Sequence, residues 1–591
     1  MCRTSVVSLI ALLLSALPAS AQPPVAQTVV VTGQAEEVPL TSLARDVVVL
    51  TREDIERLPG RSIPDVLAFA SGVNVRSRGP WGVQTDFSLR GGTFDQTLVL
   101  VDGVRVNDAQ SGHHNGDIPV PLDAIERIEV LLGPGSSLYG ADAFGGTINI
   151  ITRRSGSYRT LSLSAGSSRD VSGSGAFAGT RRGVRESLAF SADRSSGFEV
   201  DRDYRTFDVR SGTRFADGAS VQVALLDKHF GANGFYGPAQ SVEWTNEALI
   251  SADGALAITS RWRGRWQAAY RTHGDTFTYD RFNPGMPNRH RDGSVELDGR
   301  VARALSGSTR ITAGMGAGAD WIRSNNLGDH SLSRVSGFAE LQQQLGGRTT
   351  MYAGLRGDDY STFGSAVSPS LAAVAWFGRL LKVHASTGHA FRVPTFTDRF
   401  YSDPANVGNA ALTPERAWGS DAGVDLLGPG GLTVGVTAFD RHDSDTIDFV
   451  RASIADRWQA ENIRKVVVDG LEISAHRRFG ADASAGASYT FIDPRTGTLP
   501  LLSHYALAVA RHSLDVTGTE QAGRFAFGGR LAYVRRQDGR DYWLADVRIA
   551  RPFARATVFV DGTNLLDTSY QEIVGVDMPG LAFRMGLTVR P

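Results

Sequence analysis

The feature that most constrains the fold is an alternation of apolar and polar residues that starts near residue 155 and runs to residue 591. Segments of about 8–12 residues, such as LTVGVTAFDRH and FAFGGRLAYVRR, are separated by turns rich in Gly, Asp, Asn and Ser. Alternation with a period of two gives each β-strand one apolar face. The pattern predicts an all-β region of about 430 residues without a helical interlude, which exceeds the usual size of one soluble core.

Two architectures produce this local pattern, a soluble β-sandwich and a closed membrane barrel. The length of the region and the aromatic residues near segment ends, among them Trp262, Trp266 and Trp543, favour the barrel. A closed barrel also satisfies its backbone hydrogen bonds in lipid. At about 20 residues per strand and turn, we expect roughly 22 antiparallel transmembrane strands, a size whose lumen is normally plugged. The predicted fold class is therefore β, with residues 155–591 as the barrel.

Composition excludes other classes. No uncharged apolar run of about 18 residues follows the N-terminal segment, which excludes a bundle of membrane helices. The net charge of −1 gives no general attraction to nucleic acid. Residues 1–21 combine Arg3, an apolar run and a small-residue Ala-Ser-Ala end, which predicts a cleaved signal peptide rather than a retained anchor. Cys2, the single cysteine, lies in this peptide, so the mature chain would have no disulfide.

Two segments precede the barrel. Residues 22–40 contain Pro23, Pro24 and Pro39 around the extended run TVVVT, which predicts a flexible arm carrying a strand-forming peptide. Such a peptide is suited to join the sheet edge of a partner. Residues 41–154 mix strand-like runs with two short helices, and we expect a small α+β domain that fills the lumen as a plug.

One stretch of the plug, residues 102–152, contains residue types found in metal sites, in catalytic acid pairs and in phosphate-binding loops. SGHHNGD has adjacent histidines, but neighbours on an extended strand face opposite ways, so chelation of a metal by both is unfavourable. We predict no metal site there, and expect either a polar loop tip or an exposed apex that contacts substrate. The residues assigned to that apex are Gln110, Ser111, His113, His114 and Asn115.

The other two ingredients also have structural explanations. Glu126 and Glu129 flank Arg127 on a predicted strand and face opposite sides, which excludes an acid pair for catalysis. We expect these three charges to form ion pairs with the barrel wall. The glycine-rich run after Leu132 lacks the spacing of a phosphate-binding loop, so its glycines are expected to make tight turns. No catalytic triad is present, and no enzymatic activity is predicted.

Residues 229–247 and 272–292 are rich in aromatic and polar residues. They are too long for periplasmic turns, so we expect extracellular loops that contact a large ligand, with ordinary loop packing as the alternative. The aromatic residues assigned to this contact are Phe235, Tyr236, Trp244, Phe277, Tyr279 and Phe282.

Taken together, these motifs resemble a TonB-dependent outer-membrane receptor over nearly the whole mature chain. The plug runs SLRGG, LVLVDGVRVND and IERIEVLLGPGSSLYGADAFGGTINIIT carry the resemblance, as do HAFRVPTFTDRF and GTNLLDTSYQEIVGVDMPG in the barrel. A departure is Leu581, which follows Pro579 and Gly580 where the family pattern has arginine. By this resemblance the TonB box comprises Thr28, Val29, Val30, Val31 and Thr32.

The resemblance implies active transport of a scarce nutrient, with the arm captured by TonB and its inner-membrane energising complex. It implies a monomer in the outer membrane of a Gram-negative-type cell, surrounded by lipid and lipopolysaccharide and inserted by the barrel-assembly machinery. The chain is most similar to cobalamin receptors; a ferric siderophore and haem are the alternative ligands, and a passive porin or adhesin needs neither plug nor arm. No cofactor is expected, with structural calcium in the extracellular loops left open.

Overall fold

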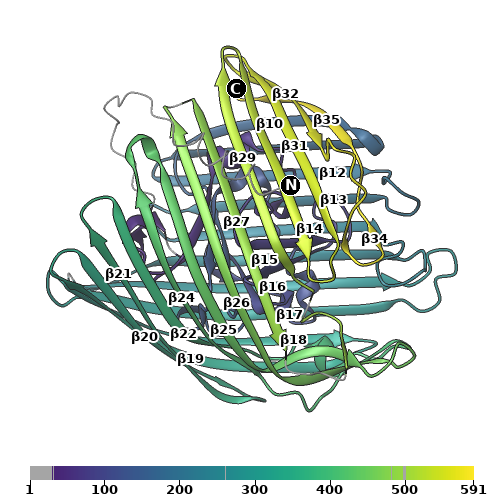
Figure 1. Ribbon diagram of the computed structural model, residues 1–591, viewed down its shortest axis with the longest axis horizontal. Helices are drawn as coiled ribbons and strands as arrows, with labels where there is room; N and C mark the ends of the chain where they lie inside the picture. The colour runs from purple at the N-terminus through teal and green to yellow at the C-terminus, as the bar shows by residue number, and fades with distance from the viewer. Residues whose placement is uncertain (1–28, 31, 260, 481, 497–500, 507) are drawn as a thin grey trace, which may run out of the picture.

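A computed structural model describes residues 29–30, 32–259, 261–480, 482–496, 501–506 and 508–591. The predicted signal peptide lies outside these residues. The chain forms a closed antiparallel barrel of 22 long strands around a plug, which is purple in Figure 1. The predicted fold class and strand number are therefore confirmed. None of the helices described is long and apolar enough to cross a bilayer.

The barrel strands follow one another around the wall in chain order, and β35 closes the circle by pairing with β10. Their bounds are β10 (Tyr158–Gly166), β11 (Asp170–Arg181), β12 (Val184–Ser195), β13 (Tyr204–Arg214), β14 (Ser220–Gly231), β15 (Val242–Thr259), β16 (Trp262–Thr278), β17 (Asn288–Ala304), β18 (Thr309–Ser324), β19 (Gly328–Leu345), β20 (Thr349–Tyr360), β21 (Gly364–Phe377), β22 (Leu381–Arg392), β24 (Glu415–Leu427), β25 (Thr433–Arg451), β26 (Trp458–Phe479), β27 (Ala483–Thr496), β29 (Ala510–Ala522), β30 (Phe525–Arg536), β31 (Asp541–Pro552), β32 (Ala556–Thr563) and β35 (Ala582–Val589).

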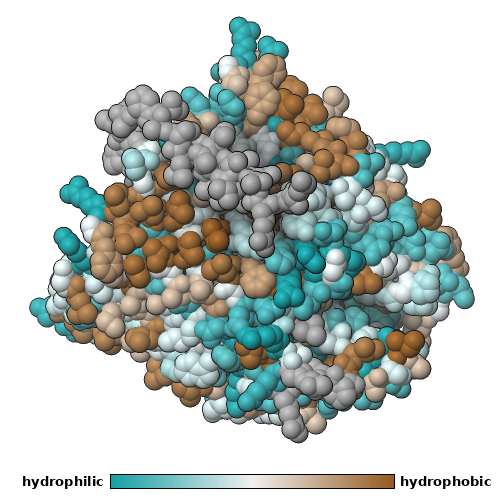
Figure 2. All heavy atoms as spheres, viewed as in Figure 1, coloured by the Kyte–Doolittle hydropathy of each residue, from teal (hydrophilic) through white to brown (hydrophobic). Residues whose placement is uncertain are grey.

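The alternating apolar and polar residues of each barrel strand lie on opposite faces of the wall, toward the outside and toward the lumen. On β14, Val221, Val223 and Leu225 are exposed on the outer wall, whereas Gln222 and Lys228 are buried toward the plug. Figure 2 shows apolar side chains gathered over the strands labelled β21 and β24 and again over β32 and β35. An apolar outer band with a polar interior is the arrangement that lipid requires of a barrel.

The two rims of the barrel differ. One rim has short connections such as 182–183 and 346–348, and the other carries longer ones, among them 232–241, 279–287, 393–414 and 564–581. Short turns face the periplasm in barrels of this kind and longer loops face outward. Short elements lie in the long connections: α5 (Phe396–Phe400), β23 (Asn406–Val407), β28 (Leu502–Ser503), β33 (Gln571–Ile573) and β34 (Val576–Asp577).

The plug is built on a five-stranded sheet with a separate hairpin. The sheet order is β3-β8-β9-β6-β7, and β4 pairs with β5. The bounds are β3 (Val47–Thr51), β4 (Val73–Ser77), β5 (Thr85–Leu89), β6 (Thr97–Val101), β7 (Val104–Arg105), β8 (Ile125–Leu132) and β9 (Gly146–Thr152). Its core side chains, such as Ile128 and Ile148, are fully buried, and each contributes about 1.5–3 kcal/mol by leaving water.

Local sequence signals set the plug helices. Thr51 is the N-cap of α2 (Arg52–Arg57), and Ser62 is the N-cap of α3 (Ile63–Leu67). Each of these two residues forms a capping box with an aspartate three residues later. α4 (Ser136–Tyr139) is a single turn that ends at Gly140, whose φ of 79° disfavours other residues. Asp102 and Gly103 both have positive φ, as the tight β6–β7 turn requires.

Candidate functional site at the plug apex

The plug apex is the connection between β7 and β8, and it folds on itself through two short polar side chains. The Asp108 carboxylate accepts hydrogen bonds from the backbone N–H groups of Gln110 (2.8 Å) and Ser111 (3.1 Å). The Asn115 side chain accepts from the Asp108 N–H at 2.9 Å. Asp and Asn commonly stabilise turns in this way. A single 3-10 turn, η3 (Gly112–His114), results.

The prediction of an exposed apex is wrong. Gln110, Ser111, His114 and Asn115 are all at least nine-tenths buried. The His113 Nδ1 atom lies 2.8 Å from an Asp86 carboxylate oxygen, and its ring stacks on Phe94 with centroids 4.1 Å apart. The apex is enclosed because barrel strands and an extracellular loop pack directly against it.

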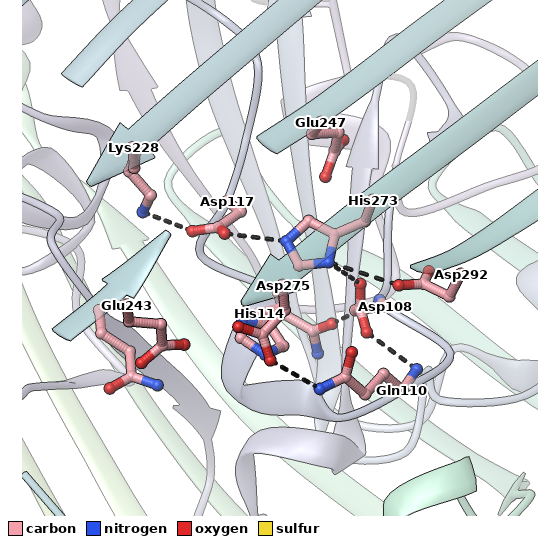
Figure 3. Close-up of polar contacts among 12 residues, drawn as sticks. Asp108, Gln110, His114, Asp117, Lys228, Glu243, Glu247, His273, Asp275 and Asp292 are labelled. Atoms are coloured by element: carbon pink, nitrogen blue, oxygen red, sulfur yellow. Dashed lines mark hydrogen bonds and ion pairs between the residues drawn. The ribbon is translucent and has the colours of Figure 1, made fainter. Parts of the chain in front are cut away.

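Beside the apex, buried ionisable side chains of the plug meet those of β14 to β17 (Figure 3). His273 on β16 is central: its Nε2 atom lies 3.1 Å from Asp117, and its Nδ1 atom lies 3.0 Å from Asp108 and 3.4 Å from Asp292. We call this group the apex cluster; it comprises Asp108, His114, Asp117, Lys228, Glu243, Glu247, Arg271, His273, Asp275 and Asp292.

Burial and charge act against each other at the apex. Burial favours the neutral imidazole of His114, but the negative charge of Asp275, whose carboxylate lies 3.6 Å away, outweighs it and raises the pKa of His114 to about 9. Burial also favours protonation of Asp117, yet the nearby Lys228 ammonium and His273 lower the pKa of that carboxyl. His113 differs: burial lowers its pKa despite the adjacent Asp86. The two adjacent histidines thus have opposite charge preferences.

The predicted extracellular loops are shorter than expected. Trp244 lies within β15 and Phe277 within β16, and Phe235 is buried beneath its loop. Tyr236, Tyr279 and Phe282 remain on the loops 232–241 and 279–287 and are exposed by 43%, 57% and 70%. The histidines of these two segments, His229, His273 and His290, all lie on strands. The strands in these two segments are longer than the loop-like composition suggested, because the polar residues of the segments face the lumen.

A loop that was not among the predicted site residues contacts the apex directly. Within residues 393–414, the backbone N–H of Phe396 donates to the Ala109 carbonyl (3.0 Å) and that of Thr397 to the Gln110 carbonyl (2.9 Å). Arg392 fixes the loop by bonding Glu415 (2.8 Å) and Asp398 (3.0 Å). The available signal was the HAFRVPTFTDRF run, in which proline and an N-capping threonine predict a helical turn directly after a strand.

The partners that the structure shows for Glu126, Arg127 and Glu129 lie in the plug and its arm, not in the barrel wall as predicted. Arg127 donates to Glu129 within the plug (2.7 Å), and Glu126 lies 4.0 Å from Arg153 at the end of the plug. Glu129 is fully buried, and its carboxylate accepts hydrogen bonds from the N–H and the hydroxyl of Thr32 (2.9 and 2.6 Å). These charges organise the plug and its arm.

The described part of the arm is therefore bound to the plug. β1 (Val29–Val30) pairs with β2 (Val38–Pro39), which agrees with a strand-forming peptide. Thr32 bonds Glu129 and also accepts from the Asn149 side chain at 3.0 Å. Thr28 and Val31 lie outside the described residues. The predicted flexibility does not extend to residues 32–35, which are buried.

Ion pairs do join plug and barrel, through other residues and mainly at β15 to β26. Arg90 bonds Glu472 on β26 at 2.6 Å, and Arg271 on β16 bonds Asp108 at 2.9 Å. Gln96 donates to Glu415 on β24 at 3.0 Å. We call this side of the interface the anchored flank.

The opposite side, at β10 to β14 and β29 to β35, contains a cavity of about 430 Å³ between plug and wall. The wall there carries small hydroxyl side chains, including Ser162, Ser164, Ser172 and Thr557, and α2 forms part of the plug side. Ion pairs such as Arg61 with Asp193 (3.1 Å) border the cavity. We call this side the cavity flank.

Comparisons with known proteins agree with this architecture. Residues 39–147 match the TonB-dependent receptor plug domain, and residues 136–569 match the TonB-dependent receptor-like β-barrel. A vitamin B12 transporter BtuB of Vibrio vulnificus is 27% identical, and the alignment covers 92% of this chain and 91% of that protein. BtuB of Vibrio cholerae is 28% identical over 72% of this chain and 71% of its own length.

Solved structures share the fold at lower identity. The siderophore receptor PirA of Pseudomonas aeruginosa superposes with a TM-score of 0.73 at 22% identity, covering 92% of this chain and 99% of that one. The pyoverdine receptor FpvA of the same species gives a TM-score of 0.79 at 15% identity, covering 95% and 96%. This family consists of receptors and transporters that work with TonB on small-molecule ligands. With a plug inside a 22-stranded barrel and both family models matched, the chain belongs to the TonB-dependent receptors of the outer membrane.

Proposed function

We propose that this receptor imports cobalamin, or a closely similar corrinoid, with energy supplied through TonB. The observation that carries the choice of ligand is the compensation of charge around the extracellular part of the lumen. Arg78 lies 3.3 Å from Asp86, and Arg105 lies 2.5 Å from Asp142. Arg334 lies 2.5 Å from Glu296 and 3.0 Å from Asp320.

Paired arginines attract a polyanion weakly because their field is already cancelled at short range. A ferric catecholate carries several negative charges, whereas the charges of cobalamin largely cancel. The compensated lumen therefore favours the ligand of low net charge. The extent of the alignment with vitamin B12 transporters, 92% of this chain, supports the same choice.

Contact with the ligand would come from the exposed aromatic loop residues. Tyr236, Tyr279 and Phe282 lie on adjacent extracellular loops. Aromatic rings offer apolar faces and, for tyrosine, a hydroxyl that suits amide groups at the edge of a corrin. We assign first capture of the ligand to these three residues.

Energy coupling would use the arm. TonB would pair with Thr28–Thr32 as an added strand. Because Thr32 is bonded to Glu129 and Asn149 of the plug, a pull on the arm is transmitted to β8 and β9. The plug sheet would then shift relative to the wall and open a path.

The test is binding to the purified receptor, measured by calorimetry with cyanocobalamin, ferric enterobactin and haemin. We expect cyanocobalamin to bind with a Kd below about 1 μM, roughly −8 kcal/mol, and the others at least about tenfold more weakly. Siderophore or haemin binding of that strength without cobalamin binding would overturn the proposal. Deleting residues 28–32 should abolish uptake by cells and leave binding unchanged.

A ferric siderophore is the second candidate, because of a small cavity of about 60 Å³ beneath the loop 393–414. Arg105, Arg334, Arg392 and Arg399 line it. Arg399 Nε has no hydrogen-bond partner among the residues described. A guanidinium with unused donors is suited to an anionic group. Arg399→Ala separates the candidates, since it should weaken siderophore binding and leave cobalamin binding intact.

A further inference from the structure

The apex cluster has more negative than positive permanent charge. Its carboxylates, at Asp108, Asp117, Glu243, Glu247, Asp275 and Asp292, outnumber its permanent cations, Lys228 and Arg271. All of these side chains are at least nine-tenths buried. Carboxylates removed from water need compensating charge nearby, because an unpaired buried ion is very costly. The excess negative charge has to be removed by protons on some of the carboxylates, or balanced by protons on the histidines or by a bound cation.

The histidines and acids of the cluster also have the spacing of metal ligands. His114, Asp117 and His273 each offer one ligand atom, and these atoms all lie within 4.8 Å of one another. The two imidazole rings lie side by side, with centroids 4.8 Å apart and their planes tilted by 41°. Two imidazole nitrogens and a carboxylate oxygen form a donor set that suits Zn²⁺ and similar ions, whereas Ca²⁺ and Mg²⁺ prefer oxygen alone.

Unsatisfied oxygen atoms support a bound cation. Asp275 is 5% exposed, and its Oδ1 atom has no hydrogen-bond partner in the described part of the chain. Asp275 also forms a second group of possible ligands with His114 and Glu243, again within 4.8 Å. Two buried carboxylates facing one imidazole repel each other unless a positive charge lies between them. Both groups share His114, so a cation bound at His114 relieves this repulsion.

We propose that the apex cluster binds one divalent transition-metal ion of the Zn²⁺ class, with His114 and Asp117 of the plug and His273 of the barrel as ligands. Asp117 keeps its ion pair with Lys228 through Oδ1, while Oδ2 and His273 Nε2, 3.1 Å apart, turn to the metal (Figure 3). The ion joins the plug apex to β16. It is a resident of the interface and separate from the nutrient proposed above, so the two proposals can fail independently.

The test uses the full-length receptor in detergent, stripped with a chelator and titrated with Zn²⁺ at pH 7.5. We expect one equivalent to bind, and affinity to fall at least about tenfold in both His114→Gln and His273→Gln. His330→Gln is the matched control, because His330 stacks on Phe400 outside the cluster. Co²⁺ in place of Zn²⁺ should give visible absorption bands that are lost in the same two variants.

Other variants and outcomes keep the proposal open to refutation. Asp117→Asn has nearly the same shape and can still bond His273, so it tests ligation without emptying the site; it should also lose the Co²⁺ bands. Heat-dependent mobility in gels confirms that each variant is a folded barrel. Failure of the stripped wild type to bind Zn²⁺ at pH 7.5 and 8.5 would show that protons alone compensate the charge. Equal binding by wild type and folded variants would place the metal elsewhere, and either outcome overturns the inference.

Discussion

The two flanks of the plug–barrel interface differ in how the plug contacts the barrel wall. On the anchored flank, charged plug side chains reach the wall directly, as Arg90 does with Glu472 at 2.6 Å. On the cavity flank, the wall offers small hydroxyl groups, and a cavity of about 430 Å³ lies between wall and plug. A buried charge that loses its partner costs several kcal/mol, whereas a serine that faces a hydrated cavity loses little when its neighbour moves. The part of the plug that faces the cavity, which includes α2, can therefore move at lower cost, whereas Arg61 at the border of the cavity is held by Asp170 and Asp193.

The largest effect should follow from breaking the anchored flank at its centre. Arg90→Ala leaves Glu472 and Asp421 buried without their shared partner, so we expect the plug to be destabilised by about 3–5 kcal/mol. Guanidinium titration of the plug, followed by limited proteolysis, measures this. Glu53→Ala is the control: its partner Arg57 is partly exposed, and the change should stay below about 1 kcal/mol. Because Glu53 also meets Arg478 on β26, both substitutions lie on the anchored flank, and equal effects would show that burial of the partner does not set the cost.

A smaller effect should appear with pH. Because the pKa of His114 is raised from 6.5 to about 9, its charge stabilises plug docking fully below about pH 6.5, and this contribution is lost as the pH rises through 9. We expect chelator-treated receptor to lose about 2–3 kcal/mol of docking stability between pH 6.5 and 9.5. The same titration of His114→Gln should lose about 2–3 kcal/mol less in this window. Other buried groups, such as Asp95, whose pKa burial raises to about 8, titrate in both proteins. Profiles of equal slope in wild type and variant would refute the raised pKa of His114.

Releasing the arm should have a more modest effect. Glu129→Ala removes the acceptor of two hydrogen bonds from Thr32, worth about 1–2 kcal/mol together, and should raise the affinity for the TonB C-terminal domain about tenfold. Calorimetry with that domain measures the change. Glu126→Ala, an exposed residue of the same strand, should leave the affinity as in wild type. Unchanged affinity in Glu129→Ala would mean that Thr32 is not released when TonB binds.

The smallest effect on stability should come from filling the cavity flank. Ser162→Phe places a ring in the cavity, and we expect a change in stability of about 1 kcal/mol or less. If the plug moves on this side, uptake should nevertheless fall several-fold while ligand binding stays unchanged. Leu163→Phe, on the outer face of the same strand, is the control for insertion into the membrane. Normal uptake by Ser162→Phe would assign the moving side to the other flank.

The sequence predicted the fold because the fold depends on local and periodic signals. Strand alternation, the caps at Thr51 and Ser62 and the Asp102-Gly103 turn can each be read over a few residues. The partners of buried charges could not be read in this way. Glu129 meets Thr32 across 97 residues, and Arg90 meets Glu472 across 382. The apex histidines were predicted to be exposed because composition does not reveal which strands enclose a polar loop.

The seam between β10 and β35 has a consequence for assembly. Its ladder extends only from Leu161 to Gly166, whereas β25 and β26 are paired from Thr433 to Val450. With six residue pairs, as few as between β31 and β32, the seam is one of the two most weakly paired parts of the wall. It also joins the last strand of the chain to the first barrel strand, so the cylinder can be completed only after every other strand has been made. The seam borders the cavity flank, and the plug is therefore least tightly fitted where the barrel is the last to close.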